Sequence, residues 1–457
     1  MSLAHDLSSN YENNMPQSSM SKEPTPIPPA TRREIFSWAM FDFANSGYTT
    51  VVLTAIFNAY FVGVVAGHGA DRDGSATLLW TLATALANGL ILLTAPVLGA
   101  IADARAWKKR FLAFTTVGCV ASTALLALAG PGDIGWAVAF VILSAFMFGS
   151  GENLIAAFLP EIATQARMGR ISGYGWTLGY FGGLLVLGIC LAYVLAAQAR
   201  GETAAQYVPF TLLVTASVFA LASLPTFLWL RERAIPVPLP AGMGYVRAGF
   251  SRLRRTWNEA ARFRDLARFL ASLTLYQCGV YTVIVLAAVY AQEVMGFSTT
   301  DNIFLILVVN VTAAAGAFIF GHVQDRLGSV RTLSITLLLW MAAILIAFLS
   351  TERAMFWLSA NLIGLAMGSS QSAGRAVIGM FTPPERAAEF FGLWGFATKL
   401  AAIVGPLSYG AIAYATAGNQ RLAVLVTLVY FIAGLVVLLS VNEQRGRTAA
   451  LAVHPQT

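Results

Sequence analysis

Four ionisable side chains lie inside long apolar stretches of the sequence, where a charge has few favourable surroundings. They are Asp42, Glu152, Arg375 and Lys399. A charged group at the centre of a lipid bilayer costs roughly 3 kcal/mol on insertion scales, so it normally faces a water-filled cavity or an opposite charge. Two acids and two bases in such surroundings could form ion pairs that open and close, exchange a proton, or bind a charged solute.

The depth of these groups in the membrane indicates which of them could meet. At 1.5 Å per residue, Asp42 lies about 10 Å above the cytoplasmic start of its apolar segment. Glu152 and Arg375 lie late in segments that run back toward the cytoplasm, so these three share one layer. We hypothesise that Asp42 or Glu152 pairs with Arg375 when the inner side is closed. In the alternative, Asp42 anchors its helix near the interface and pairs with Arg32 or Arg33.

Lys399 falls nearer the middle of the membrane and could receive a substrate carboxylate, or alternate between that and a protein carboxylate. Amide and hydroxyl side chains at a comparable depth would complete a site for a small anionic or zwitterionic solute. They are Asn45, Thr49, Gln277, Tyr281 and Gln371. Gln277 and Tyr281 are spaced i, i+4 and therefore share one helix face. The alternative for each amide is an interhelical hydrogen bond.

The elements that must position these groups are transmembrane helices. The chain has 457 residues, of which 57% are apolar and 11% charged, whereas soluble proteins have about 25% charged residues. A helix needs about 20 apolar residues to cross a bilayer. Twelve charge-free runs qualify, namely 43–70, 74–102, 111–132, 134–151, 171–199, 203–230, 269–292, 302–324, 332–351, 354–374, 400–420 and 422–442. The fold class expected is an all-α membrane protein with twelve transmembrane helices in two six-helix pseudo-repeat bundles.

The distribution of basic residues predicts the orientation of these helices. Most of the 29 Lys and Arg residues fall on the side that holds both termini, and the positive-inside rule makes that side cytoplasmic. We expect a disordered cytoplasmic tail (1–34), a six-helix bundle (35–230), a basic cytoplasmic loop that ends as an amphipathic helix (231–265), a second six-helix bundle (266–441) and a cytoplasmic tail (442–457). High Ala, Gly and Arg usage favours a bacterial inner (plasma) membrane.

Glycine spacing predicts where helices approach closely. Gly175, Gly179 and Gly183 recur every four residues, as do Gly364 and Gly368. Small residues at this spacing allow helix backbones to pack together in membranes.

The two halves of the chain repeat a loop motif. "GAIADARAWKKR" contains Gly99, Asp103 and Lys109, and 222 residues later "GHVQDRLGSVR" contains the corresponding Gly321, Asp325 and Arg331. An aspartate in such a loop could cap a neighbouring helix N-terminus and pair with an arginine across the mouth of a cavity, which would favour an inward-closed state. The alternative is a simple loop cap.

These loops resemble the signature of the major facilitator superfamily. The second copy matches it through Arg326 and Gly328, whereas the first has Ala104 and Ala106 in the equivalent places, which calls its tight turn into question. "DFANSGYTT", "LPEIA" with "ISGYGWTLGYFGG", and "QSAGR" with "EFFGLWGFATK" are similar to the branch of vacuolar-effluxer-like transporters, related to an autophagy-linked amino-acid effluxer. The similarity covers residues 37 to about 440.

The resemblance implies a secondary active transporter. It would move a small polar, amino-acid-like solute by alternating access, in the direction of efflux, as a functional monomer in contact with membrane lipid. The substrate would bind at the interface of the halves, near mid-membrane. Asp42 and Glu152 could couple transport to protons. The alternatives are a transporter-like membrane sensor, or a facilitator for another small organic solute or drug.

Other function classes find little support in the sequence. Only four histidines are present, without HExxH, GxSxG or a phosphate-binding loop, so neither an enzyme nor a metal or cofactor site is expected. The net charge of +7 reflects cytoplasmic loops of a membrane protein and does not predict a nucleic-acid partner. Each of the three cysteines lies in an apolar run and is expected to be a small core residue.

Overall fold

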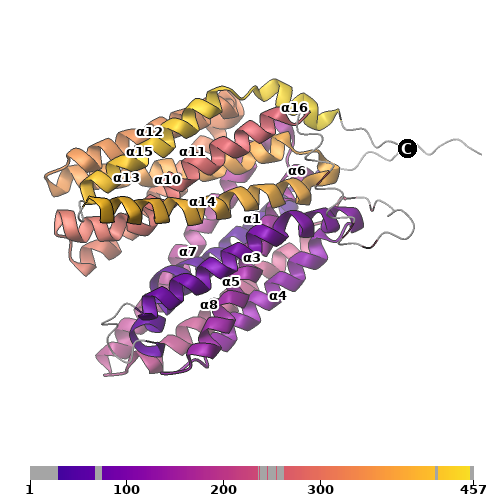
Figure 1. The fold of residues 1–457 in the computed structure, drawn as a ribbon. Coiled ribbons are helices and arrows are strands. Elements are labelled where there is room, and N and C mark those ends of the chain that lie inside the picture. The colour runs from indigo at the N-terminus through magenta and orange to yellow at the C-terminus, as the bar shows by residue number, and fades with distance from the viewer. Residues whose placement is uncertain are drawn as a thin grey trace, which may run out of the picture.

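The structure, a computed structural model, describes residues 29–66, 75–234, 262–416 and 420–452, together with Pro236, Gly244, Arg247 and Arg254. Every regular element of these residues is a helix (Figure 1). Most of the expected tail 1–34 and most of the expected amphipathic helix within 231–265 lie outside the described residues.

The N-terminal half begins with a composite helical segment. It consists of α1 (Arg32–Tyr48), the π-helical η1 (Thr49–Ala55), α2 (Phe57–Tyr60) and the π-helical η2 (Phe61–Val65). The longer helices that follow are α3 (Ser75–Arg105), α4 (Lys108–Leu126), α5 (Ile134–Ala156), α7 (Met168–Ala199) and α8 (Ala204–Trp229). The short α6 (Leu159–Ile162) and η3 (Gln165–Arg167) connect α5 to α7.

The C-terminal half has corresponding long helices. They are α10 (Arg264–Met295), α11 (Thr299–Leu327), α12 (Ser329–Leu349), α13 (Arg353–Phe381), α14 (Ala387–Ala415) and α15 (Gln420–Leu439). The turn η4 (Pro384–Arg386) precedes α14, and the nine-residue α16 (Glu443–Leu451) follows α15. Ten helical segments of the described residues are long and apolar enough to cross a membrane, and α10 and α13 are not among these ten.

Sequence signals at the helix ends explain several of these boundaries. The side chain of Thr31 caps α1 by accepting a hydrogen bond from the backbone N–H of Glu34, and the carboxylate of Glu34 accepts one from the backbone N–H of Thr31. Ser298 and Asp301 form the same reciprocal arrangement at α11. This capping box satisfies donors that a helix N-terminus leaves unpaired.

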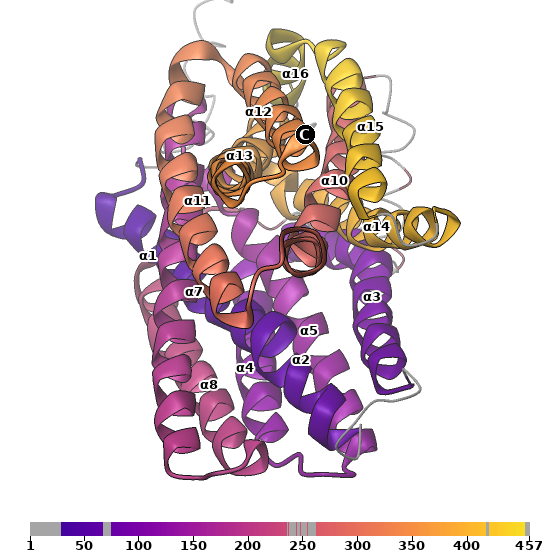
Figure 2. The ribbon, with the colours of Figure 1, turned by 90° about the vertical axis from the view of Figure 1, so that its left-hand side faces the viewer.

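The two halves meet along two pairs of helices. α11 lies beside α7, and α14 lies beside α3 (Figures 1 and 2). The ribbons converge where α3 ends and α14 begins, near α16, and diverge toward the opposite side of the molecule (Figure 1). We refer to the region where α3 ends and α14 begins as the joined end, and to the opposite side as the far end.

The predicted glycine faces do bring helices into close contact. A Cβ atom on Gly175 or Gly179 would lie within 3 Å of atoms of α1, and one on Gly368 would lie 1.8 Å from the carbonyl oxygen of Ala313 on α11. Gly364 meets α11 in the same way, at the Val309 carbonyl oxygen. Side chains larger than hydrogen would therefore separate these helices.

The first loop motif makes a tight turn without glycine. Ala106 has φ +52°, and Gly328, at the corresponding position of the second motif, has φ +88°. An L-residue with a side chain pays roughly 1–2 kcal/mol in the left-handed region. The turn questioned for the first copy is therefore present, and Ala106 adopts a strained conformation to make it.

The three cysteines, Cys119, Cys190 and Cys278, are buried and free. The expectation that they are core residues is confirmed.

Candidate functional site

A buried ion pair between α1 and α13 joins the two halves. Nη1 of Arg375 donates a hydrogen bond of 2.7 Å to Oδ2 of Asp42, and the two side chains are 4% and 12% exposed. The hypothesis offered two carboxylates for this arginine, and the structure places Asp42 there. Removing one partner of a buried pair leaves an uncompensated charge, which typically costs about 3–5 kcal/mol.

Three other residues of the N-terminal half hold the arginine in place. Nε of Arg375 donates to Oγ of Ser172 at 3.2 Å, and Nη2 donates to the Ser172 carbonyl oxygen at 2.9 Å. The guanidinium carbon lies 4.7 Å from the ring centroid of Trp38 and 5.4 Å from that of Trp176. The guanidinium therefore makes one charged, two polar and two cation–π contacts across the interface.

The glycine at position 175 makes room for this cluster. A Cβ atom there would lie 2.3 Å from Oδ2 of Asp42, 2.5 Å from Nη2 of Arg375 and 2.8 Å from the Trp38 ring. The close approach of α7 to α1 therefore leaves space for the ion pair, in addition to packing the two helices together.

A second, looser pair joins α5 to α14. Nζ of Lys399 lies 3.5 Å from Oε2 of Glu152, and these side chains are 12% and 30% exposed. Glu152 also lies within electrostatic range of Asp42 and of Tyr281. The structure therefore brings all four intramembrane charges together, and Lys399 has a protein carboxylate beside it.

The neutral residues expected at the site differ in their hydrogen bonds and in their exposure. Nε2 of Gln277 donates to Oε1 of Gln371 at 2.9 Å, so these two amides form the interhelical bond that was the alternative. Asn45 is buried, at 8% exposed, whereas Thr49 and Tyr281 are half-buried. Thr49 begins the π-helical segment η1.

The two motif aspartates cap helices of the opposite half at the joined end. Oδ1 and Oδ2 of Asp103 accept hydrogen bonds from the backbone N–H groups of Ala388 and Glu389, at 3.0 and 2.8 Å, at the start of α14. Oδ1 of Asp325 accepts from Gly169 at 3.0 Å, at the start of α7. Carboxylates at helix N-termini are stabilised by the unpaired N–H groups and the helix dipole.

Each motif aspartate has a cation beside it. Lys108, which is fully buried, lies 3.7 Å from Asp103 and also pairs with Glu161. Lys109 instead donates to the carbonyl oxygen of Leu230. The turn that precedes α4 therefore directs Lys108, and not Lys109, toward Asp103, and a gating role for Lys109 stays a prediction.

In the second motif the nearby cation is Arg170, with Nε 3.7 Å from Oδ2 of Asp325. Arg326 and Arg331 are exposed, and within the described part of the chain neither forms an ion pair. A gating role for Arg326 and Arg331 therefore stays a prediction.

In each half, a glutamate that follows the last long helix caps the helix that comes directly after the loop motif of that half. Glu232 accepts hydrogen bonds from the backbone N–H groups of Lys108 and Lys109, at 2.8 and 3.1 Å. Glu443 accepts one from Ser329 at 2.8 Å, at the start of α12. Burial raises the pKa of Glu232, and the two backbone hydrogen bonds offset part of that effect.

Sequence reasoning missed Trp38, Ser172, Trp176, Lys108 and Glu161. Signals for all five were present, since Lys108 lies within the quoted motif "GAIADARAWKKR" and Glu161 within the quoted stretch "LPEIA". Trp38 precedes Asp42 by four residues and so shares its helix face, while Ser172 and Trp176 lie within the quoted stretch "ISGYGWTLGYFGG".

Comparisons with known proteins all match this chain to membrane transporters and effluxer-like proteins. A family model described as "Vacuole effluxer Atg22 like" matches residues 30–451. The chain is 29% identical over 413 residues to the "Uncharacterized MFS-type transporter YxiO" of Bacillus subtilis, covering 89% of this chain and 94% of that one. It is 26% identical over 334 residues to autophagy-related protein 22 of Yarrowia lipolytica, covering 66% of this chain but only 55% of that protein.

Solved structures show the same fold. The human organic anion transporter MFSD10 matches with TM-score 0.69 and 16% identity, covering 90% of this chain and 100% of that one. A bacterial homologue of the iron transporter ferroportin in an outward-facing state matches with TM-score 0.66 and 13% identity, covering 90% and 99%. The proton:xylose symporter XylE matches with TM-score 0.67 and 14% identity, covering 91% and 96%.

Proposed function

Because the chain belongs to the family of vacuole-effluxer Atg22-like proteins, which has the major facilitator fold, we propose that it is a secondary active transporter. Its solute is small, polar and amino-acid-like, and alternating access moves it out of the cytoplasm. The observation that carries this proposal is the distribution of charge, because two acids of one half face two bases of the other half.

We propose that all twelve long helical segments span the membrane, in two bundles of six. α10 and α13 have 32 and 29 residues, which exceeds the about 20 that a span needs. α13 carries Gln371 and Arg375, and α10 carries Gln277. A helix that lines a polar interface needs a smaller apolar face than one surrounded by lipid, so its lower hydropathy is consistent with a span.

The structure corresponds to an inward-closed state in this proposal, with the joined end facing the cytoplasm. Two layers of contact support this interpretation: the aspartate caps at the joined end and, deeper, the pair between Asp42 and Arg375. The basic loops at the joined end favour its cytoplasmic placement, in a bacterial inner membrane, with both termini on that side. Inward opening would break these contacts together.

The pair of Glu152 and Lys399 is the proposed solute site. Its separation of 3.5 Å and partial exposure mean that the two charges meet loosely and can be reached. A zwitterion presents a carboxylate to Lys399 and an ammonium group to Glu152, so it satisfies both charges at once. A simple anion would leave Glu152 without a partner, which is costly in a low-dielectric site. Asn45, Thr49 and Tyr281 are proposed to contact the rest of the solute, together with the amide atoms of Gln277 and Gln371 that do not take part in the bond between these two residues.

Proton coupling through Glu152 or Asp42 is part of the proposal, and so is function as a monomer surrounded by lipid. A proton on Glu152 would release Lys399 to a solute carboxylate, because the lysine would no longer face a negative charge. Transport that is coupled in this way would be driven by a pH gradient across the vesicle membrane.

The experiment that tests the function is counterflow of a pooled, labelled amino-acid mixture in proteoliposomes. We expect exchange with the wild-type protein, and a loss of at least about tenfold in the Lys399→Ala variant because a charged hydrogen bond contributes about 1.5–3 kcal/mol. Arg353→Ala is the matched control, since Arg353 is an exposed cation at the far end. It should exchange normally.

Folded wild-type protein without exchange would exclude amino acids as the solutes. Binding of an amino acid without net flux would instead identify a membrane sensor. Equal exchange by wild type and Lys399→Ala would contradict the assignment of the site.

A further inference from the structure

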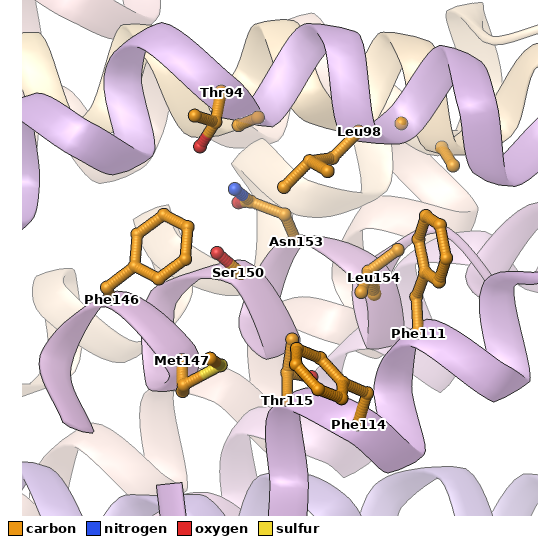
Figure 3. A pocket seen from close by; sticks show the side chains of 13 residues that line it. Thr94, Leu98, Phe111, Phe114, Thr115, Phe146, Met147, Ser150, Asn153 and Leu154 are labelled. Atoms are coloured by element: carbon orange, nitrogen blue, oxygen red, sulfur yellow. The ribbon is translucent and has the colours of Figure 1, made fainter. Parts of the chain in front are cut away.

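The N-terminal half contains a cavity that the transport site does not use. Its volume is about 270 Å³, and it lies between α3, α4 and α5 (Figure 3). The side chains around it are uncharged. Most are apolar, among them Leu98, Phe111, Phe114, Phe146, Met147 and Leu154.

Two polar side chains of α5 lie in the wall of this cavity without partners (Figure 3), and the amide of Asn153 also lies against Gly395 of α14. The Ser150 hydroxyl and both amide atoms of Asn153 have no hydrogen-bond partner, although the residues are only 5% and 6% exposed. The hydroxyls of Thr94 and Thr115 are different, because each donates to a carbonyl oxygen of its own helix. A buried polar group left unpaired costs about 1–3 kcal/mol, so a ligand that bonds to Ser150 and Asn153 after a small rotation of these side chains would gain that free energy.

The cavity is reached from the lipid-facing surface. Phe114, on its rim, is 67% exposed, and Leu93 on α3 and Val117 on α4 are 71% and 68% exposed. Exposed apolar side chains on a transmembrane bundle face hydrocarbon. A cavity of 150 Å³ in another protein holds benzene, so this one can hold a larger apolar body.

We propose that this cavity binds, from within the bilayer, a neutral amphipathic molecule with an apolar chain and one hydroxyl group. A hydroxyl both donates and accepts, which matches the amide of Asn153 and the hydroxyl of Ser150. The absence of charge among the lining side chains excludes an ionised head group at this depth. Fatty alcohols and hydroxyl-bearing lipids such as diacylglycerol share this chemistry.

An occupant of the cavity would also favour the inward-closed state. Ala388, at the start of α14, lines the cavity together with Gly99 of α3. A Cβ atom on Gly99 would lie 2.0 Å from the Ala388 carbonyl oxygen, so the backbones of the two halves touch at the rim. The wall that Ala388 provides is complete only while the joined end is shut, and a ligand shifts the equilibrium toward the state that it contacts better.

Photolabelling tests the binding site without reference to transport. The protein is reconstituted in nanodiscs and labelled with a diazirine-bearing fatty alcohol, and the modified peptides are identified by mass spectrometry. We expect labels within 94–98 and 146–154, competed by decanol and not by decane. A diacylglycerol competitor distinguishes a lipid source from a free alcohol. Equal competition by decane, or labelling spread evenly over the lipid face, would overturn the proposal.

Variants of residues in and near the cavity provide controls for the photolabelling experiment. Leu98→Trp fills the cavity and should abolish the local label, whereas Leu93→Trp places the same side chain on the outer face of α3 and should not. Asn153→Leu removes the polar end and should weaken decanol competition by about tenfold or more. An unchanged label in folded Leu98→Trp protein would contradict the site. The competition experiment on wild-type protein gives an answer even if a variant fails to fold.

A distance measurement tests the effect on conformation. Spin labels at Arg110 and Leu327, which are exposed near the joined end in opposite halves, report the opening of that end. The three native cysteines are buried and so interfere little with labelling. Decanol should reduce the population with long distances, and Leu98→Trp should remove that response. A distance distribution that decanol leaves unchanged would overturn the conformational part of the inference.

Discussion

At the scale of single residues, Arg375 makes contacts to several side chains across the interface between the halves. It pairs with Asp42, donates to Ser172, and lies against two tryptophan rings. Every one of these partners belongs to the other half of the chain. The free energy of this cluster therefore depends directly on whether the two halves are together.

We predict that exchanging the two charges restores function in part. Asp42→Arg and Arg375→Asp should each lower exchange at least about tenfold, because each leaves like charges buried together. The double variant recreates an ion pair and should recover a measurable fraction of the wild-type exchange rate. The mismatched double variant Asp42→Arg with Lys399→Glu is the control and should recover none. If the matched double variant is as inactive as the single ones, the proposed pairing has no role in transport.

At the scale of elements, the loop after α3 has a strained backbone at Ala106, and the turn that this strain allows brings a lysine into contact with two carboxylates. Ala106 takes a left-handed conformation, and the turn places Lys108 in the interior beside Asp103 and Glu161. A glycine would adopt this φ without strain, as Gly328 does in the second half.

We predict that Ala106→Gly stabilises the protein by about 1 kcal/mol, since it removes the left-handed penalty and costs little else in a turn. The measurement is thermal unfolding in detergent, followed by the loss of monodisperse protein. Ala104→Gly, two residues earlier and inside α3, should destabilise by about 1 kcal/mol because glycine is a poor helix former. A lower unfolding temperature for Ala106→Gly would show that the alanine methyl group makes contacts worth more than the strain.

At the scale of the whole molecule, the joined end is closed by two related devices. Asp103 caps α14 from α3, and Asp325 caps α7 from α11. Each crosses from one half to the other, and the two motifs are 222 residues apart in the sequence. A gate that is built twice in this way opens only when both caps are lost.

We predict that Asp103→Ala and Asp325→Ala each shift the protein toward the inward-open state. Loss of an N-cap costs about 1 kcal/mol, so each variant should raise the population with long distances between labels at Arg110 and Leu327 by about fivefold. Asp301→Ala is the matched control, because Asp301 caps α11 at the far end within one half. It should leave the distances unchanged. Unchanged distances in both test variants would assign the caps to stability alone.

The sequence by itself determined the elements and the groups in need of partners. Charge-free runs locate the long helices, because lipid tolerates few unpaired charges and the backbone must bond within each helix. The same rule singled out Asp42, Glu152, Arg375 and Lys399. The glycine spacing of α7 and α13 predicted close packing, which the structure confirms at Gly175 and Gly368.

Only the tertiary structure decided which charge meets which. Adjacent helical residues differ in direction by about 100°, so a small change in where α4 begins selects Lys108 and not Lys109 for the interior. Depth alone placed Asp42 and Glu152 in one layer, whereas the rotation and crossing of the helices give Arg375 to the first and Lys399 to the second. Pairing across an interface depends on packing between distant segments, and that information is spread over the whole chain.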